Sequence, residues 1–490
     1  MCHRALDAQD ARFDGLFFVG ITTTRVYCRP ACPSRTAAPK HRRFFDSIAS
    51  AEGAGFRPCL RCRPELAPGR ALIDAVSRLA CVAARRIAGG GLNGRGVGEL
   101  AGELGVSERH LRRALEREIG VSPLALAQTH RLLLAKRLLA DTAVPVARVA
   151  FASGFQSLRR FNAAFRERYR LSPRDLRRGP RPAAAASVHD LVRLTLPYQA
   201  PFAWDALVTT LGRHALPGVE AVEGTQYGRT VRLEGRCGVV LATDVAARAH
   251  LAVRVSPALL PALIQLLERL RRVFDLDAEP LVVDAHLAQG GLGALVRRRP
   301  GLRLAGALDG FEGALRVLLP NQLAGPLIGA LGEVMDSGIP GLTRLVPTAE
   351  RVAEAGVARL ERLGVPRGRA HVIVAVARAV ATRVLRLEPS CDIAVTSRAL
   401  LGVVDVGDRL ATGIVMRALS WPDAFPAEDR ALQHAAGVAT TQQLDARAEQ
   451  WRPWRAYAAL HLWLEVGAWE SGGAHCLHAT ATRTVASSAH

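Results

Sequence analysis

The stretch Cys28-Arg29-Pro30-Ala31-Cys32 is followed, after 26 further residues, by Cys59-Leu60-Arg61-Cys62. Two closely spaced cysteine pairs at this separation can supply four thiolates to one tetrahedral zinc ion. The spacing therefore predicts a zinc site made by Cys28, Cys32, Cys59 and Cys62. Four ordinary buried cysteines, or a disulfide, would use the same residue types. A disulfide is disfavoured because Met1-Cys2-His3-Arg4 opens no apolar signal segment, so we expect a cytoplasmic protein.

Length and charge limit which classes of protein this chain can belong to. The 490 residues are enough for three or four domains, and 49% of them are hydrophobic. No run of 18 apolar residues occurs, so no membrane span is expected. Residues 1–180 hold 32 basic and 15 acidic residues, whereas the remainder holds 33 and 29. Positive charge concentrated in one part of a chain is typical of binding to a polyanion, most often nucleic acid.

The residues around the cysteines resemble the N-terminal methylphosphotriester-repair domain of the Ada adaptive-response proteins. The matching stretches are Phe18–Cys32 and Ala54–Glu65, and the resemblance covers roughly residues 10 to 66. It implies that Cys28 is both a zinc ligand and the acceptor of a methyl group. Zinc keeps cysteine in the nucleophilic thiolate form, and four thiolates on Zn²⁺ carry a formal charge of −2. A zinc site that only holds the fold is the commoner role for four cysteines and stays open at this point.

Methyl transfer to this cluster would also change its charge. A thioether in place of one thiolate makes the cluster less negative, because its formal charge changes from −2 to −1. Less negative charge beside DNA phosphates should tighten DNA binding, so the reaction could act as a switch.

A pattern repeats in the basic segment. Ala101 and Gly105 recur, 49 residues later, as Ala150 and Gly154. In each copy a small residue fits where two helices cross and the glycine allows a tight turn, which predicts two helix-turn-helix units. The helix that follows each turn has a buried face predicted from i, i+4 spacing. These faces are formed by Leu111 and Leu115, and by Phe161 and Phe165.

The two units resemble the DNA-binding module of AraC-type transcription regulators, up to the closing stretch Arg170–Arg178. A long helix from about Leu124 to Leu139 would join them, so that they enter successive major grooves. The resemblance implies contacts with double-stranded DNA, many of them to phosphates, and a regulator with RNA polymerase as a possible partner. The expected DNA-contacting residues are Arg109, Arg112, Arg113, Ser157, Arg159 and Arg160.

After a Pro- and Ala-rich linker at 179–187 the pattern changes to short alternating runs and then to helices. The chain is expected to be multidomain and mainly α with α+β parts. We expect a zinc domain at 1–70, a double helix-turn-helix at 74–178, a small antiparallel-sheet domain at 188–278, an all-α domain at 279–470 and a disordered tail at 471–490.

The C-terminal half resembles the DNA-3-methyladenine glycosylase II family of the helix-hairpin-helix superfamily. The matching stretches are Glu449–Trp463, Met416–Asp429 and Leu302–Glu312. The resemblance implies excision of alkylated purines after the base is flipped out of the stack. Asp429 would be the catalytic carboxylate that stabilises a positively charged sugar. Trp463 would line the base pocket, and Gln322 would fill the gap left by the flipped base.

Other roles stay open for these residues. Asp429 also suits a helix N-cap, and Trp451 and Trp454 are expected to be core aromatics. A lyase reaction is not expected, because no lysine follows Lys136 to form a Schiff base. An iron-sulfur cluster is not expected either, because the C-terminal half holds only three, widely spaced cysteines: Cys237, Cys391 and Cys476.

The chain departs from the glycosylase pattern at its expected DNA contacts. In Val403–Ala411 one glycine, the proline and the tryptophan of the usual hairpin are missing, and Arg409 stands in place of the tryptophan. Asp405 and Asp408 add negative charge where phosphate should bind, and Gly413 stands where a tyrosine is common. Two hypotheses follow: a repair enzyme combined with a regulator, or a regulator and methylation sensor whose glycosylase domain is inactive.

Overall fold

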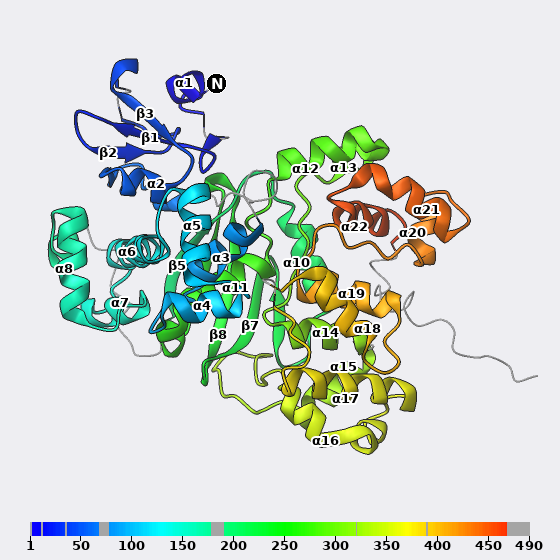
Figure 1. Ribbon diagram of the computed structural model, residues 1–490. Coiled ribbons are helices and arrows are strands. Elements are labelled where there is room, and N and C mark those ends of the chain that lie inside the picture. The colour runs from blue at the N-terminus through cyan, green and yellow to red at the C-terminus, as the bar shows by residue number, and fades with distance from the viewer. Residues whose placement is uncertain are drawn as a thin grey trace, which may run out of the picture. The chain divides into compact units, whose positions relative to one another are not determined.

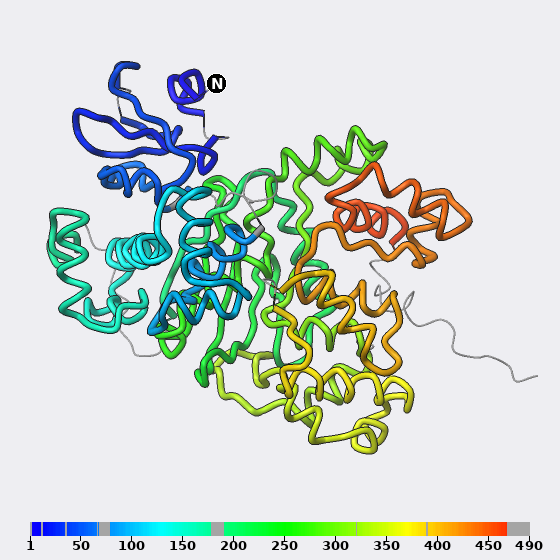
Figure 2. Tube along the Cα trace, viewed as in Figure 1, coloured from blue at the N-terminus to red at the C-terminus, as the bar shows by residue number. Residues whose placement is uncertain are grey.

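The computed structural model describes residues 2–10, 13–34, 37–67, 78–177, 191–319, 321–388 and 391–467 (Figure 1, Figure 2). The chain divides into two compact units, residues 1–202 with 223–280 and residues 203–222 with 281–490. The predicted linker at 179–187 and tail at 471–490 lie outside the described residues. No helix among those described is long and apolar enough to cross a membrane. The finer division into four domains, a linker and a tail stays a prediction.

A small sheet begins the first unit. Its four strands are β1 (Phe18–Ile21), β2 (Val26–Cys28), β3 (Arg42–Phe45) and β4 (Arg57–Pro58), in the order β3-β1-β2-β4. β4 runs parallel to β2, whereas the other pairs are antiparallel. Helix α1 (Cys2–Asp7) precedes the sheet, and α2 (Ile48–Gly53) links β3 to β4.

A run of helices follows, and it contains both predicted helix-turn-helix units. The helices are α3 (Arg78–Ala88), α4 (Val97–Glu103), α5 (Glu108–Ile119), α6 (Pro123–Asp141), α7 (Val146–Ala152), α8 (Leu158–Tyr169) and α9 (Pro173–Arg177). Serine side chains cap α5, α6 and α8 by accepting a hydrogen bond from a backbone N–H in the first turn. Gly105 and Gly154 have φ angles of 68° and 82°, which glycine adopts without strain. Both turn glycines are thereby confirmed.

The first unit ends in an antiparallel sheet, as predicted. Its strands β5 (Val192–Pro197), β9 (His250–Val255), β8 (Arg236–Val245) and β7 (Gln226–Leu233) pair in that order. Helix α11 (Leu263–Val273) follows β9. The short strand β6 (Glu220–Glu223) stands where the chain passes from one unit to the other.

The described part of the second unit is mostly helical. Its helices include α10 (Trp204–Arg213), α12 (Pro280–Leu287), α13 (Gly293–Arg298), α14 (Gly310–Leu318), α15 (Asn321–Leu331), α16 (Ala349–Arg362), α17 (Arg367–Ala381), α18 (Ile393–Leu401), α19 (Asp408–Ala418), α20 (Arg430–Ala435), α21 (Thr441–Ala448) and α22 (Arg455–Glu465). The expected class, mainly α with α+β parts, is confirmed.

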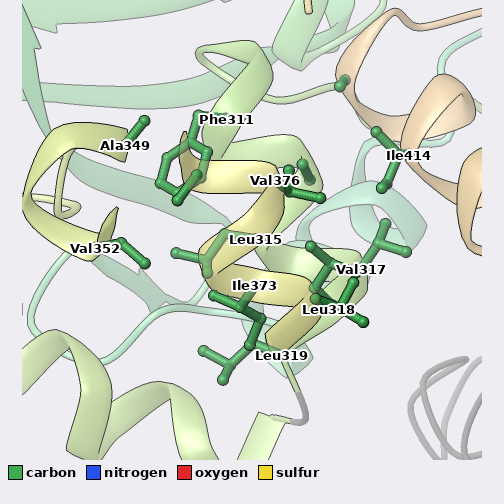
Figure 3. Packing of buried hydrophobic residues seen from close by; sticks show 14 of the residues in the cluster. Phe311, Leu315, Val317, Leu318, Leu319, Ala349, Val352, Ile373, Val376 and Ile414 are labelled. Atoms are coloured by element: carbon green, nitrogen blue, oxygen red, sulfur yellow. The ribbon is translucent and has the colours of Figure 1, made fainter. Parts of the chain in front are cut away.

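The core of the second unit forms around α14. Leu315 and Leu318 of α14 pack with Ile373 of α17 and Ile414 of α19, and all four side chains are buried (Figure 3). Each such side chain contributes about 1.5–3 kcal/mol when it leaves water. Gly313 lets α14 and α19 cross closely, because a Cβ there would lie 2.7 Å from the Cα of Ala418. This core fixes α19 and therefore the hairpin that precedes it.

Candidate zinc centre and DNA-contacting sites

The sulfur atoms of Cys28, Cys32, Cys59 and Cys62 lie within 4.8 Å of one another. Four sulfurs about 2.3 Å from one zinc ion at tetrahedral corners would be about 3.8 Å apart. The apolar side chains of Leu6 and Val19 pack around the cluster. The four residues therefore fit one zinc ion, and the predicted site of four cysteine ligands is confirmed.

Strand pairing explains how two distant cysteines meet. Tyr27 of β2 pairs with Pro58 of β4 in parallel register, so Cys28 and Cys59 follow at the same edge of the sheet. The Cys59 N–H donates to the carbonyl of Tyr27 at 2.9 Å. A tight turn then brings in Cys32, whose N–H donates to the carbonyl of Arg29 at 3.1 Å. The turn is held by Asp14, which accepts from the Ala31 N–H at 2.9 Å.

The packed sulfurs need a compensating cation. Contact with Cys32 raises the pKa of the Cys28 thiol, whereas contact with Cys28 lowers the pKa of the Cys32 thiol to about 6. Protons would thus be shared unevenly, and four thiolates cannot coexist here without a positive charge. A bound Zn²⁺ supplies that charge. Cys28 and Cys59 each keep 9% of their surface exposed, against 5% for Cys32 and 3% for Cys62.

The predicted DNA-contacting arginines lie on exposed helix faces. Arg109, Arg112 and Arg113 are exposed on α5, and Arg159 and Arg160 are exposed on α8. The opposite faces carry Leu111, Leu115, Phe161 and Phe165, all fully buried. The predicted buried faces are therefore confirmed. The DNA contacts themselves stay predictions.

Two of the residues predicted to contact DNA already have partners in the free chain. Ser157 caps α8 by accepting a hydrogen bond from the Arg160 N–H at 3.4 Å, and its hydroxyl hydrogen is still available to a phosphate. Arg112 lies 2.8 Å from Glu108 on the solvent face of α5. An exposed pair of this kind contributes only about 0–1 kcal/mol, so a phosphate can replace it readily.

Asp429 is the N-cap of α20 and is 1% exposed. Its Oδ1 accepts hydrogen bonds from the Ala431 N–H at 2.8 Å and the Leu432 N–H at 3.1 Å. Among the described residues, no other partner of this carboxylate is recorded, so Oδ2 is not held by a neighbour. The N-cap role is confirmed, and it fixes the orientation of the carboxylate. A catalytic role uses the other oxygen and stays a prediction.

The remaining glycosylase residues are spread over the second unit. Trp463 is buried on α22, which packs against α20, the helix capped by Asp429. Gln322 is exposed in the first turn of α15. Trp451 is fully buried and donates its Nε1–H to the Gly290 carbonyl at 2.8 Å, and Trp454 packs edge-on against His286. The last two are core aromatics, as expected.

A small cavity of the second unit does not include these residues. It is lined by Leu207, Arg303, Arg417 and Leu460 among others, and it holds about one water molecule. It is therefore too small for a purine, and neither Asp429 nor Trp463 contributes to it.

The loop between α18 and α19 contains one residue in a left-handed backbone conformation. It places Asp405 at a φ of 61°, in the region that favours glycine. Gly407 is the N-cap of α19 and offers no side chain there. Gly413 has little room for a larger residue, because a Cβ would lie 3.1 Å from Val317 Cγ1. An aspartate therefore adopts a conformation here that glycine adopts more readily.

The hairpin arginine has a second arginine near it that the sequence did not reveal. Two guanidinium nitrogens of Arg409, Nε and Nη2, are buried without a hydrogen-bond partner among the described residues. Burial, together with the charge of Arg409, lowers the pKa of Arg369 in α17. Arg369 therefore adds positive charge near the loop that carries Asp405 and Asp408.

Comparison with known proteins covers almost the whole chain. A curated protein of Mycobacterium tuberculosis, "Probable bifunctional transcriptional activator/DNA repair enzyme AlkA", is 38% identical over 477 residues, which span 94% of this chain and 95% of that protein. The chain belongs to this family. The DNA-3-methyladenine glycosylase 2 of Escherichia coli is 30% identical over 56% of this chain and 97% of its own length. The Escherichia coli enzyme Ada is 33% identical over 25% of this chain and 34% of its own.

Family models match three parts of this AlkA-type family member. They are the metal binding domain of Ada at residues 1–65, a helix-turn-helix domain at 100–179 and the AlkA N-terminal domain at 193–309. These matches confirm the resemblances on which the sequence interpretation depends.

One set of buried charges was missed by sequence reasoning. Glu52, Glu65 and Lys136 are 4%, 8% and 2% exposed, and each has charged or polar partners far away in the sequence. No motif marks Glu52 or Glu65. Lys136 did give a signal, because the chain has only one other lysine, Lys40, among 65 basic residues.

Proposed function

We propose that the chain is a bacterial alkylation-damage response protein that combines methyl acceptance, DNA-binding transcription regulation and excision of alkylated purines. The observation that carries the proposal is the end-to-end match to a bifunctional activator and repair enzyme, in a chain whose four cysteine sulfurs meet at one point. The proposed site of action is the bacterial chromosome, in the cytoplasm, with RNA polymerase as a partner.

Methyl acceptance is assigned to Cys28. Bound zinc keeps the sulfur an electron-rich thiolate. The sulfur donates an electron pair to the methyl carbon of a neutral phosphotriester, a carbon–sulfur bond forms, and the carbon–oxygen bond breaks. The phosphate oxygen leaves with the negative charge, so the DNA regains an ordinary phosphodiester. The protein is used once, because the thioether has no route back to a thiolate in this site.

Regulation is assigned to the two helix-turn-helix units. The arginines of α5 and α8 lie on solvent faces, where they can meet DNA phosphates and base edges. The cluster loses one negative charge on methylation, and repulsion between the cluster and the DNA backbone falls. Methylation is therefore proposed to tighten DNA binding.

Excision is assigned to Asp429. Alkylation at a ring nitrogen gives a purine a positive charge and makes it a good leaving group. As the bond to the sugar breaks, positive charge develops at the anomeric carbon, and one carboxylate oxygen can stabilise it. Oδ1 is held by two backbone N–H groups, which leaves Oδ2 for this purpose. Trp463 is proposed to stack on the flipped base and Gln322 to fill the gap in the duplex.

The methyl-acceptor assignment is tested by peptide mapping. Zinc-loaded protein is incubated with duplex DNA that carries methylphosphotriesters, and its peptides are analysed by mass spectrometry. One added methyl group on the peptide with Cys28 is the expected result. Methylation at another residue, or none, contradicts the assignment.

The alternative function, a regulator with an inactive glycosylase domain, has one observation in its favour. The hairpin lacks the usual glycine, proline and tryptophan between Val403 and Ala411. It is not favoured, because the chain is similar over nearly its whole length to a bifunctional activator and repair enzyme, and over 56% of its length to a DNA-3-methyladenine glycosylase.

A further inference from the structure

A buried carboxylate connects three elements of the first unit. Glu52 lies on α2, and its side chain is 1% exposed. Its Oε1 accepts a hydrogen bond from the Tyr27 hydroxyl of β2 at 3.1 Å. Its Oε2 accepts one from the Thr129 hydroxyl of α6 at 2.9 Å and lies 3.2 Å from Nη1 of Arg168 in α8. One side chain therefore joins three segments that are far apart in the sequence.

Two partners of Glu52 lie on the elements that carry Cys28 and the expected DNA-contacting arginines. Tyr27 is fully buried and directly precedes Cys28 on β2. Arg168 lies in the last turn of α8, the helix whose first turn carries Arg159 and Arg160. A 12-residue helix is a stiff rod about 18 Å long. A shift imposed on Arg168 therefore reaches the arginines at the other end of the helix.

The stability of the buried Glu52 carboxylate depends on the positions of its donors. Burial raises the pKa of Glu52, and the charge of Arg168 opposes that rise. A buried carboxylate is stable only while its donors stay in place, because loss of a partner leaves an uncompensated charge away from water. Its donors therefore cannot drift apart independently.

A second buried cluster ties the other half of the zinc loop to the same linker helix. Lys136 of α6 lies 2.7 Å from Glu65 and donates to the carbonyl of Cys59 at 3.5 Å. Arg63, the neighbour of Cys62, pairs with Asp141 at the end of α6. The second cysteine pair is therefore tied directly to α6, whereas the first pair is connected to it through Tyr27, Glu52 and Thr129. A rearrangement of the zinc ligands would act on the helix that joins the two helix-turn-helix units.

We propose that Glu52 is a positioning residue that couples the strand carrying Cys28 to helix α8, so that methylation of Cys28 alters how the second helix-turn-helix engages DNA. The inference rests on the proposed methyl acceptance. Conversion of Cys28 from thiolate to thioether would remove one charged ligand from the four cysteines that would hold zinc, and the end of β2 would shift. Tyr27 moves with it, and Glu52 passes the shift to Arg168. The change in cluster charge acts on any nearby phosphate, whereas the contacts from Tyr27 through Glu52 to Arg168 act on helix α8.

The test uses the full zinc-loaded chain and a fluorescent duplex of fixed sequence at fixed salt. The Kd is measured before and after stoichiometric methylation of Cys28, and the ratio of the two values is the readout. The variant is Glu52→Gln, which keeps one acceptor oxygen, replaces the other by an N–H donor and loses the charge that pairs with Arg168. The matched control is Glu167→Gln, which removes one exposed acid beside Arg168. Rates of methyl transfer to Cys28 are recorded for each protein.

The expected result is a ratio that falls in Glu52→Gln to the part that the charge change alone produces, and that stays at the wild-type value in Glu167→Gln. Methyl transfer should proceed in both. A wild-type ratio in folded Glu52→Gln overturns the coupling. Absence of methyl transfer in the wild type itself contradicts the proposed function, so the two failures are distinguishable.

Two further measurements keep the proposal open to refutation if Glu52→Gln does not fold. The double variant Glu52→Gln, Arg168→Gln replaces the ion pair by two amides, and it should fold and show the ratio that the charge change alone produces. Hydrogen exchange in the wild type needs no variant. Methylation should change amide exchange in α8 and leave the core helix α14 of the second unit unchanged. Unchanged exchange in α8 overturns the proposal.

Discussion

The zinc centre and the hairpin between α18 and α19 differ in what a substitution does to them. The zinc centre depends on four sulfur atoms, all within 4.8 Å of one another, and loss of any one removes a ligand. In the hairpin, Asp405 has a φ of 61°, a left-handed conformation that glycine adopts more readily. Loss of a ligand therefore removes the zinc site, whereas the turn needs a backbone conformation that more than one residue type can adopt.

The largest expected effect is at the zinc centre. Cys59→Ser together with Cys62→Ser removes two of four ligands, so we expect one zinc per chain in the wild type and none in the variant. Metal analysis of the purified proteins checks this. The same variant should take no methyl group on Cys28, because that thiol is no longer held as a thiolate. Undiminished zinc in the double variant would show that the ligands lie elsewhere.

The next largest effect concerns Asp429. Asp429→Asn keeps an oxygen that can accept from the Ala431 and Leu432 N–H groups, so the cap and the fold should persist. It removes the charge that stabilises the sugar, which should cost about 3–4 kcal/mol. Release of 3-methyladenine should therefore slow roughly a hundredfold or more. A single-turnover assay measures it, with Asp445→Asn, an exposed residue of α21, as the control. Equal release by wild type and Asp429→Asn would place the active site elsewhere.

Methylation of the zinc centre should have a smaller effect. The loss of one negative charge near DNA is worth about 1 kcal/mol, which is roughly fivefold in Kd. Titration of a duplex at two salt concentrations checks both the size and the electrostatic origin, because the difference should shrink as salt rises. Identical Kd values for the methylated and unmethylated forms at low salt would contradict the proposal that methylation tightens DNA binding.

The smallest effect is expected at the hairpin. Asp405→Gly suits the left-handed backbone and removes an exposed carboxylate from the place where phosphate should bind. Affinity for duplex DNA should rise about twofold, near 0.5 kcal/mol, while the free energy of unfolding changes little. Asp445→Asn again serves as the control for charge. An unchanged or weaker affinity would mean that this loop does not face DNA.

The sequence predicted most of what short-range patterns can encode. Cysteine spacing identified the zinc ligands, i, i+4 spacing identified the buried faces at Leu111 and Phe161, and the repeated glycines identified the turns. The linker helix was predicted from about Leu124 to Leu139 and extends from Pro123 to Asp141. Each of these features depends on residues that are close together in the chain.

What the sequence could not predict depends on contacts across long separations. Glu52 meets Thr129 and Arg168, and Glu65 meets Lys136, and no periodicity marks such pairs. The positive charge of Arg369 beside Arg409 was hidden for the same reason, because 40 residues separate them. Asp429 shows a different limit of sequence-based prediction. One carboxylate can cap a helix with one oxygen and offer the other to chemistry, and sequence treats these as alternatives.

The most direct test of the account is a single-turnover excision assay with wild-type protein and duplex DNA that carries 3-methyladenine. We expect release of the free base with an uncut DNA backbone, because Asp429 is held in place and no lysine follows Lys136 to form a Schiff base. We also expect a lower rate than that of relatives with the usual hairpin residues. No release by well-folded, zinc-loaded protein would contradict the proposed excision of alkylated purines and support a regulator that has lost its glycosylase activity.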